Sequence, residues 1–257
     1  MHLSVAAAQL ALGKGSYDRT ISDACLAVST AAQNGAEIVC LPEHWLLEYR
    51  DRIGEAIEEL SRAARENKIF IVTGANYITL DTGQTRVRSQ LIDSKGTVRG
   101  IQDKVHLFLG EKKSATSGDT FQLFETEFAR IGITICYDNT FPEASRTLAL
   151  KNADLLFVPS RIVAQGMEPW LLYLKTRAIE NRLPIIAPNI TYPPTYIGGS
   201  IIIDLEVDPS TNIVSPKIIA SAKDEEKVVL ADVDVEQARE LRKEKLAERL
   251  PSAYSLS

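Results

Sequence analysis

Hydrophobic and polar positions in the first third of the chain follow two alternating periods. Residues 3–9, 37–43 and 69–75 are short apolar runs, which are typical of buried strands. Two intervening segments instead repeat apolar side chains every three or four residues, as one face of a helix does. The helical positions are Ile21, Ala24, Cys25, Val28, Ala31 and Ala32 in the first segment, and Ile53, Ala56, Ile57, Leu60, Ala63 and Ala64 in the second. This order predicts a β-α-β-α-β unit with parallel strands.

The middle of the chain predicts antiparallel pairing instead. Residues 86–93 and 97–104 flank a Ser-Lys-Gly turn and are expected to form a hairpin, and residues 121–126 and 128–136 form a second pair. Helix and strand signals then alternate again: a helix at 142–151, a strand at 154–160, a helix ending at Arg182, strands at 184–190, 200–207 and 227–234, and a charged helix near 235–249. The pattern alone predicts one mixed sheet with helices packed outside it, in a single domain.

Composition excludes several classes of function. The 257 residues carry 29 basic and 34 acidic side chains, a net charge of −5, so no basic field attracts a nucleic acid. No apolar run approaches the length of a membrane span. The three cysteines form no Cys-x-x-Cys pair, which argues against a zinc site and suits a reducing compartment. We therefore expect a cytoplasmic protein that binds neither nucleic acid nor membrane.

Cys136 stands at an unusual place for a cysteine. Free cysteines are most often core residues, and Cys25 on a helix face and Cys40 within a strand are interpreted in that way. Cys136 instead lies between a strand and a helix that has acids in its first turn. A turn of this kind keeps a nucleophile accessible and provides backbone N–H groups for an oxyanion. Cys136 is therefore a candidate nucleophile.

Two more reactive side chains follow predicted strands. Glu43 is either an exposed loop carboxylate or, if partly buried, a general base. Lys104 is either a solvated lysine at a strand edge or a cation that stabilises an oxyanion. The chain contains only His2, His44 and His106, so a carboxylate is the alternative to the histidine base of most thiol hydrolases. Sequence spacing does not establish that these groups meet.

Four segments, in this order, resemble the nitrilase superfamily of carbon–nitrogen hydrolases. They are VAAAQL; LPE, which ends at Glu43; DKVHLF with Lys104, followed by GEKKSATSGD; and IGITICYDNTFPE with Cys136. NADLLFVPS, the W-x₆-RAIEN segment from Trp170 to Asn181, and GGSIIID add to the likeness. The resemblance covers nearly the whole chain.

The resemblance implies a fold and a catalytic set. The fold is an α/β four-layer α-β-β-α sandwich with a pair of mixed sheets, here one carbon–nitrogen hydrolase domain over residues 1–257. The catalytic set is Glu43, Lys104 and Cys136, with a second glutamate supplied by Glu111, the only acid between Lys104 and the SGD segment. Neither a metal nor an organic cofactor is expected, and relatives of this kind form homodimers or larger homo-oligomers.

The implied reaction is hydrolysis of the non-peptide carbon–nitrogen bond of a small linear amide. A Cys136 thioester would form, and ammonia and a carboxylic acid would leave. The backbone N–H of Tyr137 is a candidate donor to the oxyanion. Residues that follow the strands are candidates for the substrate pocket: His44, Trp45, Phe108, Asn139, Thr140, Arg161, Gln165 and Trp170. Arg161 is either a surface residue or the group that binds a substrate carboxylate, as an ω-amidase requires.

Other functions remain open on the sequence. A nitrilase or an N-carbamoyl amidohydrolase would use the same Glu-Lys-Cys set, and a non-catalytic binding protein could retain the fold. The chain also departs from the family pattern at Thr140, where a basic residue is common, and at Asn152, where a glycine is common. Asparagine tolerates the left-handed conformation of a helix end, so Asn152 is expected to act as a cap.

Overall fold

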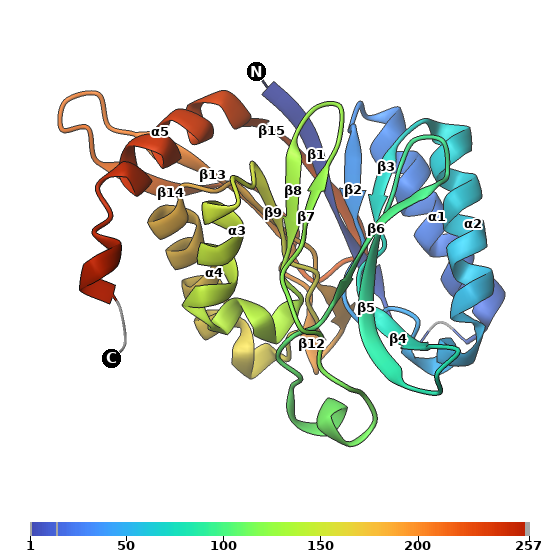
Figure 1. Cartoon of the computed structure of the whole chain (residues 1–257). Helices are drawn as coiled ribbons and strands as arrows, with labels where there is room; N and C mark the ends of the chain where they lie inside the picture. Colours follow the sequence, from blue (N-terminus) through green and yellow to red (C-terminus); the bar gives the residue numbers. More distant parts are fainter. Residues whose placement is uncertain (1, 14, 255–257) are drawn as a thin grey trace.

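Two β-sheets lie face to face at the centre of the protein, and helices cover the outer face of each sheet (Figure 1). The structure is a computed structural model and describes residues 2–13 and 15–254. In Figure 1 the blue α1 and cyan α2 cover one sheet, and the yellow-green α3 and golden α4 cover the other. The four-layer α-β-β-α arrangement is therefore confirmed, and it brings the ends of strands from both sheets together.

The first sheet has the order β12-β11-β1-β2-β3-β5-β4, with β15 paired to β1 and β6 paired to β5. β1, β2 and β3 are parallel to one another, as predicted. β5 and β6 form the predicted antiparallel hairpin. The strands are β1 (His2–Ala11), β2 (Ile38–Cys40), β3 (Phe70–Val72), β4 (Asn76–Thr79), β5 (Thr85–Ile92), β6 (Val98–Asp103), β11 (Ile190–Tyr192), β12 (Tyr196–Ile197) and β15 (Lys227–Asp234).

The second sheet has the order β14-β13-β10-β9-β8-β7. β7 and β8 form the second predicted antiparallel pair, whereas β8, β9 and β10 are parallel. The strands are β7 (Leu123–Glu125), β8 (Arg130–Ile133), β9 (Leu155–Phe157), β10 (Ile185–Ala187), β13 (Ile201–Val207) and β14 (Val214–Ser221).

The helices begin and end where local chemistry predicts. The Ser16 side chain accepts a hydrogen bond from the Arg19 N–H at the start of α1, and Gly35, with φ of 88°, follows its end. Asn152 has φ of 65° directly after α3, which confirms its expected left-handed cap. The helices are α1 (Tyr17–Gln33), α2 (Ile53–Asn67), α3 (Pro142–Leu150), α4 (Met167–Asn181) and α5 (Val235–Ala247). Within the described residues, none of the helices has both the length and the apolarity needed to cross a membrane.

Strand β1 shows how the layers are built. Alternate side chains of a strand point to opposite faces of its sheet. Leu3, Val5 and Ala7 face the core between the two sheets, whereas Ala6 and Ala8 pack under the helices. Both faces are buried, so the strand sequence is mostly apolar and lacks the regular polar alternation of a half-exposed strand.

Two expectations from the pattern are wrong. The strands form two stacked sheets rather than one mixed sheet. The strand expected over residues 128–136 ends at Ile133, so Cys136 lies three residues beyond the end of β8 and opens the 3₁₀ helix η3 (Cys136–Thr140).

The short strands β4, β11 and β12 and the long strand β14 had not been predicted. β14 lies at the edge of its sheet with many exposed side chains, so it lacks the apolar run of a buried strand.

Candidate active site

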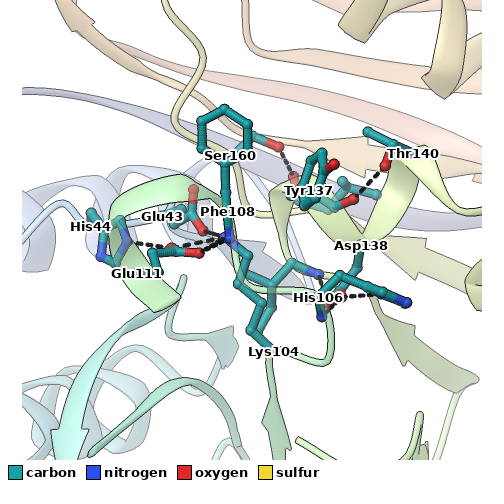
Figure 2. Close-up of polar contacts among 12 residues, drawn as sticks. Glu43, His44, Lys104, His106, Phe108, Glu111, Tyr137, Asp138, Thr140 and Ser160 are labelled. Atoms are coloured by element: carbon teal, nitrogen blue, oxygen red, sulfur yellow. Dashed lines mark hydrogen bonds and ion pairs between the residues drawn. The ribbon is translucent and has the colours of Figure 1, made fainter. Parts of the chain in front are cut away.

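Lys104 is buried between two carboxylates. It directly follows β6, and its backbone N–H donates to the Val87 carbonyl at 2.8 Å. Its side chain is only 1% exposed. The Lys104 Nζ lies 2.7 Å from Glu43 Oε1 and 2.8 Å from the Glu111 carboxylate (Figure 2). Burial alone would lower the pKa of this ammonium, but the charges of Glu43 and Glu111 raise it above the ordinary value. Lys104 therefore stays charged.

Glu43 is held between the two sheets. It follows β2, its N–H donates to the Ser160 carbonyl beyond β9 at 3.2 Å, and it pairs with Ala75 after β3. The side chain is buried, with one oxygen on Lys104. This backbone contact between the two sheets places the Glu43 carboxylate, which follows a strand of the first sheet, beside the Cys136 thiol, which follows a strand of the second.

Glu111 is the most extensively hydrogen-bonded carboxylate of the cluster. It lies in the 3₁₀ helix η2 (Leu109–Lys113), and its oxygens accept from the Phe108 N–H at 2.7 Å and from His44 Nε2 at 2.9 Å. Burial raises the pKa of Glu111, but His44, Lys104 and the Phe108 N–H outweigh it and lower the pKa to about 2. Glu111 is therefore ionised and accepts only, so the His44 Nε2 must carry the proton of that hydrogen bond.

Cys136 has φ of 46°, a conformation that costs energy for any residue except glycine. Its N–H donates to the Pro159 carbonyl at 2.9 Å, which fixes the turn after β8. The Glu43 carboxylate and the Arg161 backbone N–H both lie near enough to the sulfur to act on the pKa of the thiol. Burial and the Glu43 charge raise the pKa of Cys136 well above its ordinary value, against the opposing effects of Lys104 and the Arg161 N–H. The resting sulfur is therefore a protonated thiol beside a carboxylate.

Asp138 joins the lysine segment to the cysteine turn, a role that the sequence analysis missed. Its buried carboxylate accepts from the His106 backbone N–H at 2.7 Å, from His106 Nδ1 at 2.9 Å and from the Ile135 N–H at 3.1 Å (Figure 2). The His106 ring also stacks on Phe141. The available signal was an acid two residues after the cysteine, at a position where carboxylates cap a turn.

Arg177 of α4 holds the other end of the turn, and it too was missed. Its buried guanidinium donates to the carbonyls of Asn139 at 3.0 Å and Thr140 at 2.8 Å. It also pairs with Glu180. The residue lies in the W-x₆-RAIEN segment, which was noted for its likeness to the family but given no role. Asp138 and Arg177 together fix η3 at both ends.

Several residues that were expected to line the substrate pocket make hydrogen bonds or ring contacts within the protein. The Trp45 indole donates to the Thr73 carbonyl, and the Trp170 indole donates to Ser160 Oγ. The Thr140 hydroxyl donates to the Tyr137 carbonyl. Asn139 is buried, with its amide oxygen near Ser145 Oγ. His44 stacks on Tyr77 besides contacting Glu111. The indole N–H groups of both tryptophans are therefore already used within the protein.

The remaining nominated residues are more accessible. Phe108 is exposed, and its ring packs on that of Tyr137. Gln165 is exposed before α4. The Arg161 guanidinium lies over the Tyr196 ring at 4.8 Å, and its Nε is buried without a partner among the described residues. Arg161, Phe108 and Gln165 are therefore the more accessible nominated side chains. His44 Nδ1 and Asn139 Nδ2 are, like Arg161 Nε, buried without a partner among the described residues.

One group of described residues has ligand atoms close enough to suit a metal ion. These atoms, from Glu43, His44 and Glu111, lie within 4.8 Å of one another. The Lys104 ammonium lies between the two carboxylates and already neutralises one of their charges. A metal ion in this group would have to displace that ammonium or lie beside it.

Fold and site together define an α/β protein with a four-layer sandwich and a lysine–glutamate centre beside a thiol. The chain belongs to the carbon–nitrogen hydrolase family, whose model matches residues 4–243. It is 30% identical to the omega-amidase NIT2 of Xenopus tropicalis over 247 residues, which cover 87% of this chain and 86% of that protein. The family and these relatives make it an amidase-type hydrolase.

Solved structures share the fold. A carbon–nitrogen hydrolase from Helicobacter pylori G27 matches with a TM-score of 0.86 at 22% identity and covers 98% of this chain and 97% of its own. A glutamate-to-glutamine variant of the amidase from Nesterenkonia sp. AN1 matches with a TM-score of 0.79 at 20% identity and covers 96% of this chain and 95% of its own. That variant carries the acetamide moiety of fluoroacetamide covalently added at its active-site cysteine.

Proposed function

We propose that the protein hydrolyses the terminal carbon–nitrogen bond of a small linear amide through a thioester on Cys136, and releases ammonia and a carboxylic acid. The observation that carries the proposal is the Lys104 ammonium, buried between Glu43 and Glu111 beside the Cys136 thiol. A binding site has no need to bury a lysine against two carboxylates next to a thiol, whereas acyl transfer needs a base, a cation and a nucleophile in one place.

In the first half of the reaction, Glu43 takes the proton of Cys136 and the thiolate attacks the amide carbon. The Lys104 ammonium and the Tyr137 backbone N–H stabilise the oxyanion, and loss of one such donor costs roughly 3 kcal/mol in other hydrolases. Glu43 then gives its proton to the nitrogen, the carbon–nitrogen bond breaks, and ammonia leaves. The raised pKa of Cys136 makes this base necessary, because little thiolate exists in the resting protein.

In the second half, water attacks the thioester while Glu43 takes one of its protons. The carbon–sulfur bond breaks, the acid leaves, and the proton returns to the sulfur. Glu111 holds the Lys104 ammonium in place through both halves, and His44 holds Glu111. Glu111 is therefore assigned to positioning, and Glu43 to proton transfer.

The substrate class that the site favours is an amide bearing a carboxylate at its other end. The Arg161 backbone N–H reaches the sulfur of Cys136, so this residue borders the reacting atoms. Its guanidinium has a buried Nε without a partner in the described part of the chain, and guanidinium groups bind carboxylates in a bidentate way. The likeness to an omega-amidase agrees with this assignment.

Activity measurements on variants test the catalytic set. Cys136→Ala and Glu43→Gln are each expected to reduce ammonia release at least roughly a thousandfold, because either change removes a group that the chemistry requires. Cys25→Ala, which changes a thiol of α1 far from the site, is the matched control and should keep wild-type activity. Near-wild-type rates in Cys136→Ala would refute the assignment.

A substrate panel separates the competing reactions. The panel contains an ω-monoamide of a dicarboxylic acid, the corresponding nitrile and an N-carbamoyl amino acid. Ammonia from the amide alone, with an acyl adduct on Cys136 seen by mass spectrometry, is the expected result. Turnover of the nitrile would indicate a nitrilase, and carbon dioxide with ammonia from the third compound would indicate a carbamoyl amidohydrolase.

A binding protein without activity is the alternative of another class. We expect a small haloacetamide to modify Cys136 much faster than Cys25 or Cys40, because only Cys136 has a carboxylate base at its sulfur. Equal modification rates, with no turnover of the panel, would favour the non-catalytic function.

We also propose that the protein forms a homodimer or a larger homo-oligomer and works in the cytoplasm. A homodimer or larger homo-oligomer agrees with the large apolar side chains exposed on α4, Leu172 and Tyr173. The three free cysteines agree with a reducing cytoplasm.

A further inference from the structure

A second cluster of charged side chains lies at the opposite end of the strand that leads toward Cys136. β8 begins at Arg130, whose backbone N–H donates to the Asp154 carboxylate at 2.8 Å. Asp154 is fully buried just before β9. Helix α5 brings Arg239 and Arg242 to the same carboxylate. Three arginines from two distant parts of the chain therefore share one negative charge.

The carboxylate of Asp154 is offered more donors than it can accept. Six N–H groups lie within 3.5 Å of its two oxygens: the backbone N–H, Nε and Nη2 of Arg130, Nε and Nη2 of Arg239, and Nη2 of Arg242. A carboxylate has about four lone-pair positions. The two longest contacts, both 3.4 Å, belong to the Arg130 guanidinium. Arg130 is therefore the most weakly held of the three.

A surface hollow of about 320 Å³ opens beside this cluster. Four cationic side chains line it, Arg130, Arg239, Arg242 and Lys243, together with Asn152 and Leu246. The Arg242 side chain is only 4% exposed, so it is held in place within the wall of the hollow. Four positive charges thus meet two negative ones, those of the buried Asp154 and of Glu236, and both acids act on Arg239.

The sequence of α5 places this charge on one side of the helix. Arg239, Arg242, Lys243 and Leu246 follow the three- and four-residue spacing of a single helix face. Burial lowers the pKa of Arg242, and the neighbouring charges of Arg130 and Arg239 lower it further, against the attraction of Asp154. The cations therefore repel one another, and an additional anion would relieve that repulsion.

We propose that this hollow binds a small doubly charged oxyanion, inorganic phosphate or a phosphate monoester. The Arg130 guanidinium and the unused donors of Arg239 would bind phosphate oxygens, and Lys243 would add a point charge at the rim. The bound anion would connect α5 to the start of β8 and so stabilise the folded chain by an amount that grows with the anion concentration relative to its Kd. The site is separate from the Cys136 centre and does not depend on the proposed reaction.

Titration calorimetry and thermal unfolding of the whole protein test this site at constant ionic strength, with inorganic phosphate as the probe. We expect one saturable site and a melting temperature that rises with phosphate. Lys243→Gln, an exposed change that leaves the Asp154 contacts intact, should weaken binding roughly tenfold. Arg130→Gln should weaken it more. Lys245→Gln, on α5 but paired with Glu248, is the matched control and should bind as the wild type does.

The outcomes separate the possible ligands. If glycerol phosphate binds as tightly as inorganic phosphate, the result would support a phosphate monoester as the ligand. Tighter binding of inorganic phosphate would support the free ion. Tighter binding of succinate than of phosphate would overturn the phosphate assignment. An unsaturable response, or equal losses in Lys243→Gln and Lys245→Gln, would overturn the site itself.

Discussion

At the scale of single residues, the chemistry depends on which groups hold a charge. Glu43, Glu111 and Lys104 share their charges through contacts of 2.7 and 2.8 Å, and the thiol of Cys136 stays protonated beside them. The cluster keeps one carboxylate more than it has ammonium groups. In the proposed reaction, this surplus carboxylate is the base that takes the proton of the thiol, whose pKa is raised.

His44 is expected to act through Glu111 rather than on the substrate. His44→Ala removes a hydrogen bond to a buried carboxylate, so kcat should fall roughly tenfold or more while KM changes little. His44→Gln keeps an N–H donor of similar reach and should recover part of kcat. Steady-state kinetics measure both values. A large rise in KM at unchanged kcat would instead assign His44 to substrate binding.

Glu111 should make the folded state sensitive to acid. Its pKa is about 2 in the folded protein against an ordinary value of 4.5, so the unfolded chain binds the proton first. Its contribution to stability is complete above pH 4.5 and is lost as the pH falls toward 2. Urea unfolding across this range should show a shallower loss in Glu111→Gln than in the wild type. Equal slopes would show that the carboxylate does not drive the effect.

At the scale of elements, charged clusters fix helices and turns to the sandwich. Asp138 and Arg177 hold the two ends of η3, and Asp154 holds α5 against the start of β8 and β9. The partners of each cluster come from distant parts of the chain. These clusters therefore set the relative positions of helices and turns, whereas the formation of each helix or turn depends on its local sequence.

Asp154 should contribute strongly to stability. Asp154→Asn leaves the buried Arg242 guanidinium without its negative partner, and removal of one member of a buried ion pair costs about 3–5 kcal/mol. Urea denaturation measures the loss. The control is Glu206→Gln, which breaks the exposed pair with Lys217 and should change stability by less than about 0.5 kcal/mol. Similar losses in the two variants would contradict the account.

At the scale of the whole molecule, the contact between the two sheets determines where the site forms. Glu43 and Lys104 belong to the first sheet, and Cys136 follows a strand of the second. Gly100 of β6 lies against Phe124 of β7, across this contact. A side chain at position 100 would therefore push the sheets apart.

Gly100→Ala tests that contact. A Cβ at this position would lie 2.2 Å from Phe124 Cδ1, so the ring or the sheets must shift. Overpacking of this kind costs about 1–3 kcal/mol. Gly54→Ala in α2, where a Cβ meets nothing within 4 Å, should be neutral or stabilising. Thermal unfolding of both variants checks the difference, and an equally stable Gly100→Ala protein would show that the sheets have room to spare.

Local pattern determined much of this protein. The sequence by itself predicted α1, α2, the parallel β1, β2 and β3 and the two antiparallel pairs, because periodicity and turn chemistry act between near neighbours. It also identified the turn that carries Cys136. The left-handed cap at Asn152 was predicted from the glycine that the family commonly has there. The likeness to a known family supplied the four layers, which the pattern did not.

Only the tertiary structure decided how the sheets stack and which side chains meet. β1 is buried on both faces, so its apolar sequence cannot distinguish one mixed sheet from two stacked sheets. Glu43 and Lys104 are 61 residues apart, and their contact depends on strand ends that converge in space. The partners of His44 and Arg177 depend on the same convergence. Burial between layers is a property of the assembled fold, and the neighbours that the fold brings together keep Lys104 and Glu111 charged although burial opposes it.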